Sequence, residues 1–111
     1  MKVEDRFLHY VTYDTQSNEA SPDCPSTPGQ KLLAQALVKE MQSMGIADAH
    51  MDENGYVYGH LAANVQQPVP AIGLIAHMDT AQEVSGRDVT PKVFRNYQGE
   101  VLKLGHGYTL E

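Results

Sequence analysis

Two stretches of the chain carry apolar residues at intervals of three and four positions, which is the spacing of one face of an α-helix. The first stretch covers residues 3–13, and its apolar positions are Phe7, Leu8, Tyr10 and Val11. The second stretch follows Thr27, and its apolar face is made of Leu33, Ala36, Leu37, Met41 and Met44. The pattern predicts two amphipathic helices in the first half of the chain.

The residues around the second helix also predict where it begins and ends. Thr27 is a good N-cap, Pro28 suits the first helical position, and Gln30 completes a capping box. Gly45 favours a stop there, because glycine readily closes the last turn of a helix. Before this helix, residues 14–26 are polar and rich in turn formers, which predicts a long loop that is functional or mobile.

A β-hairpin is predicted directly after the second helix. Asn54-Gly55 lies between residues 47–51 and 56–62, and this dipeptide is a strong signal for a tight turn between two strands. Near the C-terminal end, residues 93–97 and 100–104 also read as short strands, separated by a turn at Gln98-Gly99.

The most apolar run, residues 71–76, leads into a histidine and a carboxylate. Ile72, Leu74 and Ile75 are bounded by turn residues, as expected for a strand that is covered on both faces. Side chains two positions apart on a strand share a face, so His77 and Asp79 are expected to project to the same side. The elements together predict the α/β class, with helices packed on a mixed sheet and a hairpin at one side.

Composition narrows the class of protein. The chain has 111 residues, of which 41% are hydrophobic, so it is long enough for one domain with a modest core. Its formal charge is −6 and its lysines and arginines are scattered, which argues against nucleic-acid binding. No apolar run approaches the roughly 20 residues that cross a bilayer, and no secretory signal is visible. Cys24 is a single cysteine, which fits a reducing cytoplasm and is typical of an inert thiol.

His77 and Asp79 are the candidate functional residues. An imidazole that binds a metal commonly gives its other N–H to a carboxylate, so the pair supplies one metal ligand and one supporting group. By itself such a triplet is more often a structural hydrogen-bonded pair. The apolar strand before it and the polar loop after it, residues 80–87, favour a functional site.

Three other histidines are weaker candidates. His50 and His60 lie in the predicted hairpin strands, where they could face each other and bind a metal, although polar cross-strand pairs are commoner. His106 lies between two glycines and has the freedom to reach a ligand, but such a segment is more often only a turn.

Several segments in the same order resemble the peptidase T group, the tripeptide aminopeptidases of the M20 family of zinc metallopeptidases. The segments are Tyr13-Asp14-Thr15-Gln16-Ser17, Pro25-Ser26-Thr27-Pro28-Gly29-Gln30, Pro70-Ala71-Ile72-Gly73, His77-Met78-Asp79-Thr80, Ser85-Gly86-Arg87-Asp88-Val89 and Asn96-Tyr97-Gln98-Gly99. The resemblance covers nearly the whole chain, which makes it far more specific than the histidine triplet alone.

The resemblance implies a cytoplasmic aminopeptidase that holds two zinc ions and removes the N-terminal residue from tripeptides. In the catalytic centre it makes His77 a zinc ligand, and Asp79 the residue that orients a ligand imidazole. The other ligands and the glutamate that acts as general base lie further along the family's polypeptide. Residues 1–111 are therefore expected to be the N-terminal part of a catalytic domain, inactive alone and unable to hold zinc tightly through His77. An incomplete sheet would also leave an edge that invites self-association.

Two alternatives stay open at the level of sequence. The chain could be a non-enzymatic α/β binding module, with His77 and Asp79 as a structural pair and the 14–26 loop as a partner surface. It could also be a small metalloprotein that completes its site across a dimer with His50, His60 or His106.

Overall fold

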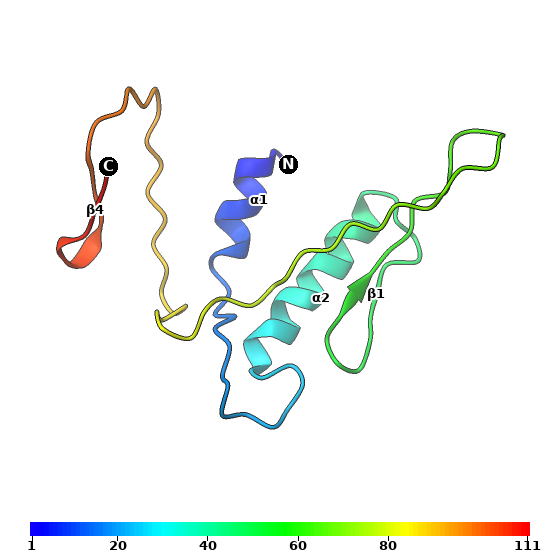
Figure 1. Ribbon diagram of the computed structural model, residues 1–111, viewed down its shortest axis with the longest axis horizontal. Coiled ribbons are helices and arrows are strands. Elements are labelled where there is room, and N and C mark those ends of the chain that lie inside the picture. Colours follow the sequence, from blue (N-terminus) through cyan, green and yellow to red (C-terminus); the bar gives the residue numbers. More distant parts are fainter.

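Two helices, a hairpin packed on the second of them, and a separate C-terminal hairpin make up the computed structural model, which describes residues 1–111 (Figure 1). Helix α1 is Val3–Tyr10 and α2 is Pro28–Ser43. Strands β1 (His50–Met51) and β2 (Val57–Tyr58) form one antiparallel sheet, and β3 (Leu102–Lys103) and β4 (Thr109–Leu110) form another, with the 3-10 turn η1 (Gly105–Gly107) between them. The α/β class is confirmed. Neither helix has the length and apolar character that a membrane span requires.

Helix α2 begins and ends where the sequence predicts, but its first turn is not capped in the predicted way. Pro28 is the first helical residue, and Gly45 adopts a φ of +94° just beyond the last turn. The predicted capping box is absent, because the Thr27 hydroxyl donates to the carbonyl of Gln16 at 2.9 Å instead of capping the helix. The Gln30 amide donates to the Ser26 hydroxyl at 3.2 Å. A contact with the preceding loop therefore replaces a local cap.

Helix α1 is three residues shorter than predicted and is tied to α2 by one carboxylate. Arg6 Nε donates to Glu40 Oε1 at 2.5 Å, and the hydroxyl of Tyr10 donates to the other oxygen of Glu40. The hydrogen bond from Tyr10, followed by the Arg6 guanidinium, holds the pKa of Glu40 below its usual value. Burial, with the same hydrogen bond, raises the pKa of Tyr10 to about 12.

The β1–β2 hairpin packs on α2 and contributes to a small core. Leu33, Ala34 and Ala49 are its buried apolar residues. The predicted Asn54-Gly55 turn is confirmed: Gly55 is buried with a φ of +87°, and Asp52 Oδ1 accepts hydrogen bonds from the backbone of Asn54 and Tyr56.

The apolar run 71–76 does not form the covered strand that its sequence predicts. Ile72, Leu74 and Ile75 are 87%, 94% and 99% exposed, and no backbone hydrogen bond joins residues 71–79 to another segment. A strand needs a neighbouring strand to satisfy its N–H and C=O groups, and none lies beside this run. The run 93–97 is likewise irregular, whereas 100–104 contains β3. The only parallel pairing in the structure is an isolated bridge between Gln16 and Thr80.

Candidate functional site

His77 and Asp79 form a close pair where the apolar run ends. His77 Nδ1 lies 3.0 Å from Asp79 Oδ1, and the two side chains are 84% and 45% exposed. The expectation that both project to the same side is confirmed. With Nδ1 facing the carboxylate, Nε2 is the ring nitrogen left to face another ligand.

The pair is anchored from one direction only. Thr80, the residue after Asp79, donates its backbone N–H to the carbonyl of Thr15 at 3.1 Å. The carbonyl of Thr80 accepts hydrogen bonds from the backbone N–H of Ser17 at 2.9 Å and from the Ser17 hydroxyl at 3.0 Å. Thr15 is buried and Ser17 is half-buried. The segment that holds the pair is thus 15–17, within the long loop predicted before the second helix.

Two cavities border the pair. One, of about 450 Å³, is mostly apolar; residues from α1 and α2, including Phe7 and Leu37, line it together with His77 and Asp79. The other, of about 480 Å³, lies toward the hairpin turn and includes Cys24 and Tyr56. His77 and Asp79 therefore line both cavities.

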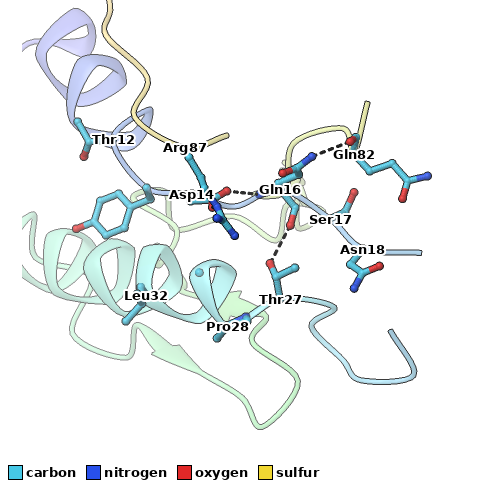
Figure 2. Close-up of a pocket in the computed structure, with 12 residues that line it drawn as sticks. Thr12, Asp14, Gln16, Ser17, Asn18, Thr27, Pro28, Leu32, Gln82 and Arg87 are labelled. Carbon is cyan, nitrogen blue, oxygen red and sulfur yellow. Dashed lines mark hydrogen bonds and ion pairs between the residues drawn. The ribbon is translucent and has the colours of Figure 1, made fainter. Parts of the chain in front are cut away.

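A third cavity, of about 660 Å³, lies beyond the anchor, and most of the residues that line it are polar (Figure 2). Gln16 crosses it, donating its side-chain amide to the carbonyl of Gln82 at 2.6 Å. Arg87 Nε donates to Asp14 Oδ2 at 3.2 Å at its edge. Asp14, Gln16 and Arg87 were not predicted individually as site residues. The only signal for them was their position within the D-T-Q-S and S-G-R-D segments.

The remaining histidines lie away from this pair. The hairpin register places His50 opposite Tyr58, with their rings stacked at 5.4 Å, and His60 lies outside β2. The minor alternative that His50 and His60 face each other is therefore not realised, because the register set by the tight turn places Tyr58 opposite His50. His106 lies in η1 with a φ of 58°, at the C-terminal hairpin.

The donor chemistry of the pair fits one ligand position of a zinc site. Imidazole is a common zinc ligand, and a carboxylate on its second nitrogen is the usual supporting group. No group of three or more His, Cys, Asp or Glu side chains gathers at one point in the structure. A structural or catalytic zinc site typically takes at least three protein ligands, so His77 would be one member of a larger set.

Comparison with known proteins identifies close relatives of the chain. No protein-family model matches the sequence. Peptidase T of Aliivibrio fischeri is 54% identical over 101 residues, which are 91% of this chain and 25% of that protein. Peptidase T of Photobacterium profundum is 52% identical over 103 residues, or 93% of the chain and 25% of the relative. Peptidase T of Parabacteroides distasonis is 48% identical over 102 residues, which are 92% of this chain and 25% of that protein.

The chain spans about a quarter of the length of these relatives and matches their N-terminal part. Identity near one half over nine-tenths of the chain is the level expected of homologous proteins with the same local structure. The chain is therefore a homologue of the N-terminal part of peptidase T.

Proposed function

We propose that this chain supplies the first zinc ligand of a dizinc aminopeptidase that releases the N-terminal residue of tripeptides in the cytoplasm. In this proposal residues 1–111 are the N-terminal part of the catalytic domain. His77 is a zinc ligand, and Asp79 holds its imidazole in place. The observation that carries the proposal is the 3.0 Å contact between His77 Nδ1 and Asp79 Oδ1, within a chain related to peptidase T.

Each residue of the pair has a defined task. Asp79 accepts a hydrogen bond from the Nδ1–H of His77, which fixes the tautomer and presents the lone pair of Nε2 outward. When bound, a pair of zinc ions polarises a peptide carbonyl and lowers the pKa of bound water. The apolar cavity beside the pair, about 450 Å³ in volume, provides room for an apolar side chain of a short peptide.

The remaining ligands and the general base are assigned to the three quarters of the family's polypeptide that the chain does not match. A single imidazole with one supporting carboxylate binds zinc weakly. The 111-residue chain is therefore expected to show no tripeptide hydrolysis and no tight zinc binding. Zinc-dependent release of the N-terminal residue by the purified chain alone would contradict this prediction.

The direct test joins this chain to the part of the Aliivibrio fischeri relative that it does not match. We expect the joined protein to hydrolyse tripeptides in a zinc-dependent manner and His77→Ala to abolish this activity. His60→Ala is the matched control, since it removes an exposed histidine outside the pair. A joined protein that folds and binds zinc but leaves tripeptides intact would overturn the proposed substrate.

Asp79→Asn tests the supporting role separately. It keeps the size of the side chain but removes its charge, so zinc affinity of the joined protein is expected to fall about 10- to 100-fold. Asp23→Asn is the control, because Asp23 is exposed and lies in the loop. Equal zinc affinity of Asp79→Asn and the unmodified protein would remove Asp79 from the site.

A further inference from the structure

The orientation of the His77–Asp79 pair depends on a short part of the loop before α2. Residues 71–79 make no backbone hydrogen bond, so nothing upstream fixes the pair. Downstream, both backbone groups of Thr80 are hydrogen-bonded to the 15–17 segment, at 2.9 and 3.1 Å. Any shift of that segment is therefore transmitted to Thr80 and, through one peptide unit, to Asp79.

Asp14 is one of the residues that fix the 15–17 segment, together with Thr27, whose hydroxyl donates to the carbonyl of Gln16. The carbonyl of Asp14 lies so close to Gly29, in the first turn of α2, that a Cβ at Gly29 would come within 1.8 Å of the oxygen. Its side chain reaches in the other direction, where Oδ2 accepts from Arg87 Nε at 3.2 Å and Oδ1 accepts from the backbone N–H of Gln16 at 3.4 Å. Asp14 thus connects α2 to the chain that follows the pair (Figure 2).

Arg87 closes this arrangement into a ring of contacts. The chain runs from Thr80 to Arg87 and returns through the ion pair to Asp14, whose neighbours hold Thr80. Gly86 permits the close approach, because a Cβ there would lie 2.8 Å from Asp14 Oδ1. The ring brackets the segment after Asp79 on both sides, while no hydrogen bond or ion pair joins Asp14 or Arg87 to His77 or Asp79.

We propose that Asp14, acting through Arg87, is a positioning residue that holds the His77–Asp79 pair in its hydrogen-bonded geometry. An exposed ion pair contributes little to global stability. Its loss should therefore loosen this ring and leave the helices intact. The expected effect on catalysis rests on the proposed function, whereas the expected effect on the geometry of the His77–Asp79 pair does not.

The test on the chain itself is the tautomer of His77, measured by nitrogen NMR at about pH 9, where imidazoles are neutral. The contact with Asp79 favours the proton on Nδ1. Asp14→Asn and Arg87→Gln are each expected to raise the fraction of His77 that carries its proton on Nε2 about twofold. The double variant should raise this fraction no further, because both substitutions break the same ring of contacts. Arg87→Lys keeps the positive charge and should therefore keep a tautomer ratio of His77 close to that of the unmodified chain. Glu4→Gln, which removes the exposed Lys2–Glu4 ion pair, is the control.

Circular dichroism of each variant separates loosening from unfolding. If Asp14→Asn lowers the helix content, the positioning role is judged from Arg87→Gln, because this variant leaves the backbone contact of Asp14 with Gly29 in place. An unchanged His77 tautomer in Arg87→Gln, or the same change in Glu4→Gln, would overturn the proposal.

The joined protein gives the second readout. Both variants should lower kcat about tenfold while KM stays within about twofold, because the pair is displaced and the substrate cavity is retained. If the unmodified joined protein is inactive, the proposed function fails and the tautomer still decides the role of Asp14. If it is active and kcat is unchanged in both variants, the positioning role is overturned.

Discussion

At the scale of single residues, one carboxylate accounts for much of the contact between the two helices. Glu40 accepts from Arg6 and from Tyr10, residues that lie more than 29 positions earlier in the chain. The side chain of Glu40 is only 17% exposed, so its charge is partly removed from water and depends on both donors. The apolar face of α1 alone would not fix its position, since none of its residues is buried.

This contact predicts a stability that depends on pH. The pKa of Glu40 is below its reference value of 4.5 in the folded chain, so its contribution is present above pH 4.5 and is lost as the pH falls through the folded-state pKa. Glu40→Gln should therefore destabilise the chain at about pH 7 by more than at about pH 3, as measured by urea unfolding. An equal difference at both pH values would show that the charge of Glu40 is unimportant.

The raised pKa of Tyr10 predicts a loss of stability in alkali. A folded-state pKa of about 12 means that the contribution of the neutral hydroxyl is complete below its reference pKa of 10.0 and is lost as the pH rises through 12. Tyr10→Phe should cost about 1 kcal/mol at neutral pH, because it removes a donor to a carboxylate. Urea unfolding measures this cost, and Tyr97→Phe, at an exposed tyrosine, is the matched control.

At the scale of elements, α2 and the β1–β2 hairpin form the best-defined unit. The hairpin turn, the helix stop at Gly45 and the helix start at Pro28 all follow from residues within a few positions of each feature. Packing adds one requirement that is not local: a Cβ at Gly59 would lie 2.4 Å from the end of Met41, so the strand approaches the helix closely there.

The turn predicts a specific sensitivity at Gly55. Gly55→Ala places a Cβ on a residue with a φ of +87°, which should cost about 1–2 kcal/mol and reduce the hairpin population. Gly73→Ala is the control, since its Cβ would meet nothing within 4 Å. Cross-strand NMR contacts between His50 and Tyr58 report the hairpin, and equal loss in both variants would contradict the prediction.

At the scale of the whole molecule, the chain is open. Its radius of gyration is 17.6 Å, whereas a compact domain of roughly 100 residues has about 13 Å. The C-terminal hairpin lies apart from α2, at the opposite side of the view from β1 (Figure 1). Apolar side chains that a complete core would bury, above all those of residues 71–76, face the solvent.

Exposure of this apolar run predicts self-association. Unpaired strand backbone with apolar side chains is a template for pairing with a second copy. We expect the chain to associate as its concentration rises and Ile75→Lys to weaken this association, measured by analytical ultracentrifugation. Leu61→Lys is the control, because Leu61 is also exposed but lies outside the run. A monomeric chain throughout the concentration series would contradict the prediction.

Local sequence predicted most elements that depend on neighbouring residues. Both helices, the tight turn at Asn54-Gly55 and the C-terminal strand near Leu102 are found where periodicity and turn residues place them. The proximity of His77 and Asp79 was also predicted, although residues 77–79 lie outside any strand. The failures concern residues 71–76 and 93–97, whose structure depends on partners distant in sequence.

The sequence by itself determined the boundaries of α2, the hairpin, the proximity of His77 and Asp79 and, through segments resembling a known family, the kinship with peptidase T. Tertiary structure alone decided which segments hold that pair. The bridge from Gln16 to Thr80 and the ion pair from Asp14 to Arg87 join residues more than 60 positions apart. The physical reason is that backbone propensity acts over a few residues, whereas hydrogen bonds and ion pairs between distant segments form only once the chain has brought them together.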